Sequence, residues 1–123
     1  MSDELSKLPP NVQERLLRLQ QLQQTLQSIL AQKQQVEMEK TEVEQTVAEL
    51  QKTADDAVIY KAIGSLLVKA EKPKVTEELV DRKELLDTRS TVLARQEERI
   101  RSQVKEAQTK LQEDLSPISQ PSS

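Results

Sequence analysis

A heptad repeat of apolar residues dominates the first half of the sequence and limits the folds open to it. From Leu22 onward, alternating steps of four and three residues mark one face of a helix, which is the spacing of a coiled coil. The positions on this face are Leu22, Leu26, Ile29, Lys33, Val36, Lys40, Val43, Val47, Leu50 and Ala54. We expect Lys33 and Lys40 to pack their stems on the seam and to extend their ammonium groups to nearby Glu side chains. A single helix cannot bury this face, so the repeat predicts a partner helix.

A second apolar stripe follows in the other half of the sequence. Five of its members are spaced seven residues apart: Leu79, Leu86, Leu93, Ile100 and Ala107. Val104 and Leu111 occupy the complementary heptad position. The two stripes pair in one antiparallel register if the chain folds back on itself, because facing residues then have numbers that add to 129. The pairs are Ile29 with Ile100, Val36 with Leu93, Val43 with Leu86, and Leu50 with Leu79. The centre of this register lies between Gly64 and Ser65, which predicts that the chain reverses there.

The stretch AVIYKAIGSLLVKA, residues 57–70, contains this centre. It holds two short β-prone runs around Gly-Ser, a two-residue turn in which glycine supplies a positive φ. The alternative is that the stretch continues the helix or forms an apolar loop between two helices. A two-stranded hairpin is marginal in water, and this one is apolar on both faces, so it needs strands from other subunits in a shared sheet or closed barrel. The residues of this expected oligomerisation hairpin are Val58, Ile59, Tyr60, Ile63, Gly64, Leu66, Leu67 and Val68.

Prolines mark the predicted boundaries of the helices. Pro9 and Pro10 fit the first turn of one helix and Pro73 fits the first turn of the other, where Thr76 is a candidate N-cap. The serines and prolines around Pro117 show no apolar periodicity, so the second helix should end near residue 114. The predicted segments are a flexible N-terminus (1–9), a helix (10–54), the hairpin segment (55–72), a helix (73–114) and a disordered tail (115–123).

Composition excludes several classes of function. The chain has no Cys and no His, which removes zinc sites, redox pairs and Ser-His-Asp triads. Its carboxylates lie on expected solvated helix faces and no Gly-rich loop is present to hold ATP, so we expect no enzyme, no cofactor and no metal. No apolar run approaches the roughly 18 residues of a membrane span. Net charge is -3 with both signs interspersed, which gives nucleic acid no basic face. We expect a cytoplasmic protein that binds neither membranes nor nucleic acid.

Three stretches carry a resemblance to a known family over about residues 8–112. They are LPPNVQERLLRLQQLQQTLQSILAQKQQVEMEKTEVEQTVAEL at 8–50, DDAVIYKAIGSLLVK at 55–69, and ELVDRKELLDTRSTVLARQEERI at 78–100. With them the chain resembles the β-type subunits of archaeal prefoldins, and the central Tyr-Lys-x-x-Gly-x-Leu-Leu-Val-Lys is the specific part. The family's hairpin strands map onto residues 58–63 and 66–70. A second hairpin, expected of an α-type subunit, is not seen, which favours β.

The resemblance implies a function that the pattern alone does not reach. Prefoldins are ATP-independent chaperones that capture unfolded proteins and deliver them to a group II chaperonin. Two α and four β subunits join their hairpins in a central double barrel, from which the coiled coils extend like tentacles and hold clients at their distal ends.

The distal ends of the two expected helices lie together and are rich in leucine. The candidate client-binding residues are Leu8, Val12, Leu16, Leu17, Leu19, Val104, Leu111 and Leu115. The seam shifts its phase here, because the step from Leu19 to Leu22 is three residues where four are due. Leu16 and Leu17 are adjacent and cannot both face one narrow seam, so apolar area should stay uncovered. The alternative is that these residues merely close the coiled coil.

Two classes of function remain open from the sequence. The first is a chaperone subunit with apolar tips. The second is a non-chaperone structural scaffold or adaptor, which would join subunits through the same seam but has no use for an apolar tip. An apolar fluorescent dye that binds at the distal end would separate the two.

Overall fold

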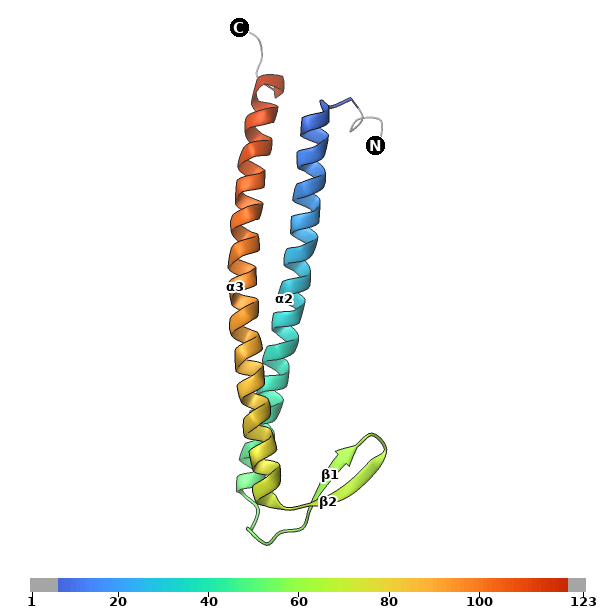
Figure 1. Ribbon diagram of the computed structural model, residues 1–123, viewed down its shortest axis with the longest axis vertical. Coiled ribbons are helices and arrows are strands. Elements are labelled where there is room, and N and C mark those ends of the chain that lie inside the picture. The colour runs from blue at the N-terminus through green and yellow to red at the C-terminus, as the bar shows by residue number, and fades with distance from the viewer. Residues whose placement is uncertain (1–6, 120–123) are drawn as a thin grey trace. The chain divides into compact units, whose positions relative to one another are not determined.

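The computed structural model describes residues 7–119 and contains two long helices joined by a β-hairpin (Figure 1). The elements are α2 (Pro10–Gln51), β1 (Ile59–Ile63), β2 (Leu66–Ala70) and α3 (Lys72–Ser119). The predicted mainly α fold, a two-helix coiled coil joined by a hairpin, is thus confirmed for the single chain. The chain divides into two compact units. We call residues 7–32 with 93–119 the terminal unit, and Lys33–Val92 the hairpin unit.

The core of the terminal unit consists of residues on the two predicted seams. Val12, at 1% exposure, and Leu22 are buried on α2, and Val104 is buried on α3. The buried set in this unit is Val12, Leu22, Ile29, Leu93, Ile100 and Val104. The apolar periodicity therefore identified the packed face of both helices in this unit.

The helices of the hairpin unit pack on Val36, Leu50 and Leu86, which are all buried. Polar contacts across the helices flank this seam. Arg82 Nη2 donates to Glu39 Oε2 at 2.9 Å, and Ser90 Oγ donates to Glu37 Oε1 at 3.1 Å.

The predicted contact of Lys40 with a nearby Glu side chain is confirmed, and Asp87 is a second, closer partner. Its ammonium lies 3.0 Å from Asp87 Oδ1 on α3 and 3.8 Å from Glu37 on its own helix. The hydrogen bond to Asp87 is the main reason that the pKa of Lys40 is raised above its ordinary value. A lysine on the seam therefore links the two helices instead of leaving a gap between them.

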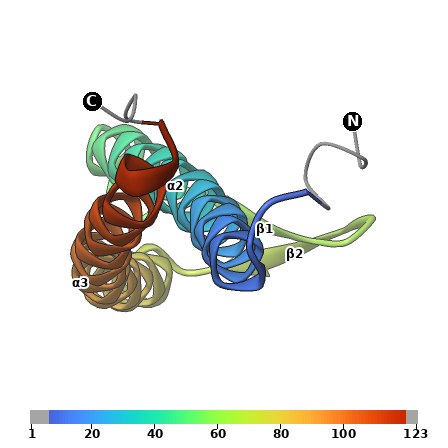
Figure 2. The ribbon, with the colours of Figure 1, turned by 90° about the horizontal axis from the view of Figure 1, so that it is seen from above.

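The hairpin has the predicted turn and register. Ile63 faces Leu66 and Ile59 faces Ala70. The numbers of facing residues in the strands therefore add to 129, as predicted for the two helix seams. Gly64 has a φ of 59° and no other residue in the described part of the chain has a positive φ. A positive φ at only the first of two turn residues is the signature of a type II′ turn, which glycine favours. Figures 1 and 2 show the hairpin projecting away from the helix segments of its own unit.

The helix ends differ from the predicted ones near the hairpin. α2 ends at Gln51 and not at Ala54, which is exposed and outside the helix. The Thr53 hydroxyl donates to the Leu50 carbonyl at 2.6 Å, and the Thr53 N–H donates to the same carbonyl at 3.1 Å. These local bonds satisfy the carbonyl that a further helical turn would have used.

The predicted N-cap of the second helix is wrong. Thr76 lies inside α3, where its hydroxyl donates to the Lys72 carbonyl at 2.8 Å. The helix begins one turn earlier, because the Glu71 carbonyl already accepts the Val75 N–H at 3.0 Å. Lys72 Nζ donates to the Thr53 carbonyl at 2.8 Å and ties this start to the end of α2.

α3 also continues beyond the predicted end at residue 114, to Ser119. Leu111, Asp114 and Leu115 are half-buried, so side-chain packing stabilises the turn that precedes Pro117. The predicted disordered tail therefore begins with helix, and residues 120–123 lie outside the described residues. Of the predicted flexible N-terminus, residues 1–6 lie outside them too, whereas the Leu8 carbonyl accepts a hydrogen bond from Gln13 Nε2 at 2.7 Å.

Candidate functional site

The hairpin exposes most of its apolar side chains. Six large ones between Val58 and Val68 are 44% to 72% exposed, and Leu67 is the most exposed of them. The six are Val58, Tyr60, Ile63, Leu66, Leu67 and Val68, while Ile59 is half-buried. So dense an apolar surface on eleven residues is typical of a protein–protein contact.

Each face of the hairpin carries one lysine among apolar side chains, so both faces are largely apolar as predicted. Because facing residues share a face, Lys61 lies with Val68 and Lys69 lies with Tyr60. Lys61 Nζ is 2.5 Å from Glu78 Oε2 on α3, and this hydrogen bond is the main reason that the pKa of Glu78 is lowered. The face of Lys61 is otherwise apolar, and its one charge is paired within the chain. Its members are Ile59, Lys61, Ile63, Leu66, Val68 and Ala70.

Both edges of the hairpin carry free backbone groups. In a hairpin with a two-residue turn, the pair that flanks the turn is hydrogen-bonded, and such pairs alternate with non-bonded ones along the ladder. Ile63 and Leu66 flank the turn. The peptide groups that point outward, where another strand can pair with them, belong to Tyr60 and Ala62 on β1 and to Leu67 and Lys69 on β2.

The predicted client-binding residues lie together in the terminal unit with graded exposure. Val12 and Val104 are buried between the helices, so for these two the structure agrees with the view that they close the coiled coil. Leu17 is 56% exposed, while its neighbour Leu16 is half-buried. The other half-buried members are Leu8, Leu19, Leu111 and Leu115. Among the predicted client-binding residues, the accessible apolar surface therefore consists of Leu17 and the edges of five other leucines.

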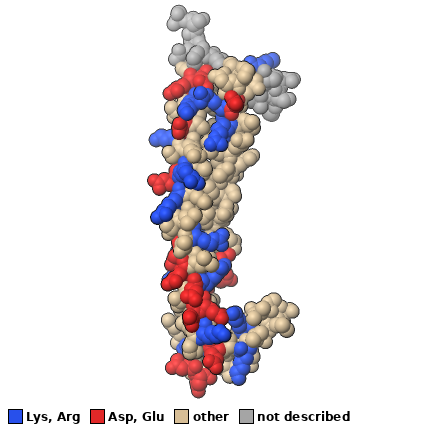
Figure 3. Space-filling view, viewed as in Figure 1, with Lys and Arg blue, Asp and Glu red and all other residues tan. Residues whose placement is uncertain are grey.

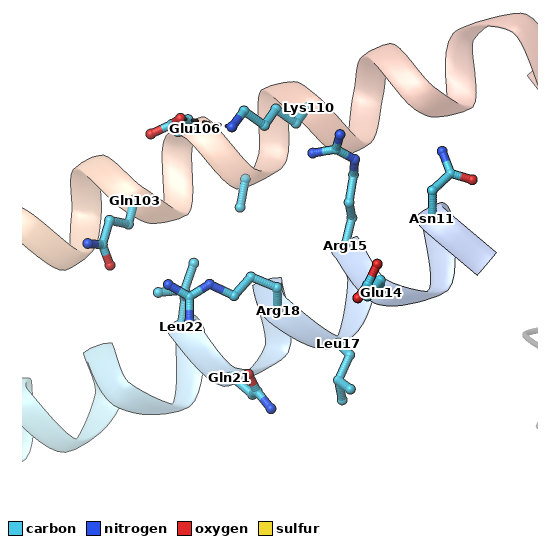
Figure 4. A pocket seen from close by; sticks show the side chains of 11 residues that line it. Asn11, Glu14, Arg15, Leu17, Arg18, Gln21, Leu22, Gln103, Glu106 and Lys110 are labelled. Atoms are coloured by element: carbon cyan, nitrogen blue, oxygen red, sulfur yellow. Dashed lines mark ion pairs between the residues drawn. The ribbon is translucent and has the colours of Figure 1, made fainter. Parts of the chain in front are cut away.

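A groove of about 710 Å³ runs between α2 and α3 in the terminal unit (Figure 4). Leu22 and Ala107 contribute apolar surface to it, and Arg18 and Gln103 are among its polar residues. Figure 4 shows Leu17 pointing away from α3. The full lining is Asn11, Glu14, Arg15, Leu17, Arg18, Gln21, Leu22, Gln103, Glu106, Ala107 and Lys110.

An ion pair between Arg15 and Asp114 links the helices at this groove, and its contacting atoms are shielded from water. Sequence reasoning missed the charged residues here because it followed only the apolar stripes. A signal was present, since the numbers of Arg15 and Asp114 also add to 129.

The described residues hold neither a helix that could span a membrane nor a cluster of acidic residues that could bind a metal ion. The candidate surfaces are the hairpin, and the leucines and groove of the terminal unit. The fold defines a class of chain in which two long antiparallel helices are joined by a hairpin with exposed apolar side chains.

Comparison with known proteins identifies the family. Residues 13–117 match the family model described as "Prefoldin subunit". The chain is 46% identical to prefoldin subunit beta of Archaeoglobus fulgidus, covering 92% of this chain and 97% of that one, and 41% identical to that of Pyrococcus furiosus with the same coverage. The crystal structure of the prefoldin beta subunit from Thermococcus strain KS-1 is 38% identical, has a TM-score of 0.79, and covers 94% of this chain and 98% of that one. The chain belongs to the prefoldin subunit family, a family of chaperone subunits that are not enzymes, and the predicted resemblance to archaeal β subunits is confirmed.

Proposed function

We propose that the chain is a subunit of an ATP-independent chaperone that holds unfolded proteins with the apolar surface of its terminal unit and passes them to a group II chaperonin. The observation that carries this proposal is the exposure of Leu17 beside five half-buried leucines. A scaffold gains nothing from an uncovered leucine at this place, whereas an unfolded client offers apolar side chains that can cover it.

The hairpin is proposed to join this chain to other prefoldin subunits in a β-barrel, in an assembly of two α-type and four β-type subunits that includes this chain. Its outward peptide groups and its exposed apolar face both support a partner that adds strands. Burying the face of Lys61 inside such a barrel costs less than burying an unpaired charge, because Glu78 pairs with the only charge on this face.

Each client contact is proposed to be weak. One exposed leucine gains roughly 1.5 to 3 kcal/mol on full burial, which alone gives no useful affinity. Several subunits acting on one unfolded chain supply the remainder through effective concentration. The same weakness lets clients leave without nucleotide hydrolysis, in a cytoplasm where a chaperonin is present to receive them.

Aggregation of a chemically denatured client, followed by light scattering without nucleotide, tests the proposal. The full assembly should suppress aggregation at stoichiometric amounts. An assembly that lacks residues 1–19 and 105–123 should keep its subunit number and lose most of this protection. Equal protection by both assemblies would contradict the terminal unit as the client site.

A further inference from the structure

One line of exposed residues on α2 in the terminal unit carries no charge, although Glu14 and Arg18 are exposed near its start. Starting from Leu17, exposed residues follow at alternating steps of three and four, which keeps them on one line along the helix. We call this line the neutral stripe; it consists of Leu17, Gln20, Gln24, Gln27 and Ala31. No Asp, Glu, Lys or Arg occurs anywhere between Leu19 and Gln32. Outward positions of coiled coils are normally where charged residues keep the helices soluble, so an uncharged line here needs a reason.

The outward face of α3 in the same unit provides an internal comparison. Its equivalent exposed line is Arg95, Glu98, Ser102, Lys105, Thr109 and Gln112, in which charged residues make up half. Figure 3 shows an uninterrupted tan surface along part of α2, whereas blue and red atoms follow α3. The lack of charge is therefore a property of one helix and not of coiled-coil surfaces in this chain.

We propose that the neutral stripe binds the peptide backbone of unfolded clients and so makes their capture independent of client charge. The inference rests on the proposed chaperone function and names the part of the client that is recognised. Each Gln side chain offers an acceptor oxygen and two N–H donors, and an unfolded segment offers the matching unpaired N–H and C=O groups at every residue. The complementarity is one of neutral dipoles, which neither repels nor selects acidic or basic sequences.

Two neighbouring features place a client segment on this stripe. Leu17, its first member, is the most exposed of the predicted client-binding leucines. When Leu17 contacts an apolar side chain of the client, the adjoining backbone of the client lies next to Gln20 and Gln24. The groove of about 710 Å³ opens beside the stripe, and Gln21 belongs to its lining. Client side chains thus have space beside the residues that would hold their backbone, in a groove whose lining carries both charges, among them Glu14 and Arg18.

The experiment uses full-length chain in its native assembly and two denatured clients of opposite charge, reduced lysozyme (basic) and reduced α-lactalbumin (acidic). Two triple variants place charge on the stripe: Gln20→Glu with Gln24→Glu and Gln27→Glu, and the same positions changed to Lys. The matched control, Ser102→Glu with Thr109→Glu and Gln112→Glu, adds the same three charges to the outward line of α3. Helical content by circular dichroism and the mass of each assembly verify that every variant folds and assembles.

Unaltered chain should bind the two clients with affinities within about threefold of each other at low salt. The Glu variant should lose about tenfold in affinity for the acidic client and little for the basic one, and the Lys variant should do the reverse, since three exposed like-charge contacts act together. Raising the salt to 1 M, where the Debye length is about 3 Å, should remove both effects. The α3 control should stay within about twofold of the unaltered chain.

Three outcomes would overturn the inference. Stripe variants that bind both clients like the unaltered chain would show that clients do not touch the stripe, while a chaperone that still holds both clients keeps the proposed function. Assemblies of the stripe variants that lose mass without client would assign the stripe to contacts between copies of this chain. Unaltered chain that binds neither client would overturn the proposed function, and the inference with it.

Discussion

The hairpin and the terminal unit both expose apolar side chains, but they arrange them in opposite ways. The hairpin concentrates six of them on eleven residues, beside outward peptide groups that can pair with a strand. The terminal unit spreads its leucines over two helices, buries most of each, and mixes them with charged and amide side chains. A dense surface with fixed hydrogen-bonding geometry suits one permanent partner, whereas a dispersed one suits many transient partners. The predictions below test this division.

The largest effect is expected from charge on the apolar face of the hairpin. Changing Ile63→Asp together with Val68→Asp should break the assembly into small species, because two carboxylates cannot be buried without partners. Helical content should stay nearly unchanged, since the seams of the helices lie elsewhere. Mass photometry and circular dichroism measure the two quantities. An assembly of unaltered mass would show that this face is not the contact between subunits.

A second large effect concerns the register that places both surfaces. Val43→Cys with Leu86→Cys should form a disulfide within one chain, because their numbers add to 129 and a disulfide needs Cα atoms about 4.4 to 6.8 Å apart. The control pair, Val43→Cys with Val80→Cys, should stay reduced within one chain, since Val80 lies outside the seam and is exposed. Non-reducing electrophoresis under mild oxidation distinguishes bridges within a chain from bridges between chains. If oxidation gave only bridges between chains, the antiparallel pairing of the two helices within one chain would be wrong.

The ion pair at the groove should matter less than the hairpin but be detectable. Arg15→Ala leaves Asp114 with shielded carboxylate oxygen and no counter-charge, so the free energy of unfolding should fall by about 1 to 2 kcal/mol. Arg15→Ala with Asp114→Ala should recover part of this loss, as a double-mutant cycle measures from chemical denaturation. Assembly mass should not change. A double variant as unstable as the sum of both single variants would mean that the two residues do not interact.

Client protection should respond only weakly to any one leucine. Leu17→Ser should weaken suppression of client aggregation by about two- to threefold, because each contact gains little. Leu85→Ser is the matched control, since Leu85 has 51% exposure against 56% for Leu17 but belongs to the hairpin unit. If both variants lost the same amount of client protection, exposed leucines of the terminal unit would contribute no more than exposed leucines elsewhere in the chain.

The sequence predicts the packed faces and the reversal of this chain well, because both follow from a repeat. A single antiparallel register, in which facing residues have numbers that add to 129, predicts the helix seams, the strand pairs and the position of Gly64 at the turn. Each additional pair of residues supports this same register. Helix ends are predicted less well because they depend on single bonds. Thr53 satisfies the Leu50 carbonyl and stops α2 early, and Lys72 bonds to Thr53 where α3 begins. No periodicity encodes such contacts.

In the candidate site, too, the features that follow from the apolar repeat were predicted, whereas those that depend on local packing were not. The seam break at Leu19 and Leu22 pointed to uncovered apolar area, and Leu17 is exposed. How deeply Val12 and Val104 are buried depends on how the side chains of both helices share the space, which spacing along one helix does not determine. The groove was missed for this reason, since Leu22 and Ala107 are the only lining residues that belong to the stripes.

The smallest expected effect is a pH dependence of the hairpin, and it sharpens the contrast with the terminal unit, whose ion pair is shielded. The pKa of Glu78 is lowered by its hydrogen bond to Lys61, so folding favours its charged form. The stabilisation is therefore complete above the ordinary carboxyl value of 4.5 and is lost as pH falls through the lower folded value. Both side chains are well exposed, at 45% and 42%, so the effect should be small and should weaken with salt. Glu78→Gln should remove it, so that the difference in Tm between the variant and the unaltered chain disappears below about pH 4. A difference that instead grew as pH fell would mean that Glu78 is stabilised in its protonated form, and Lys61 would not be the group that neutralises it.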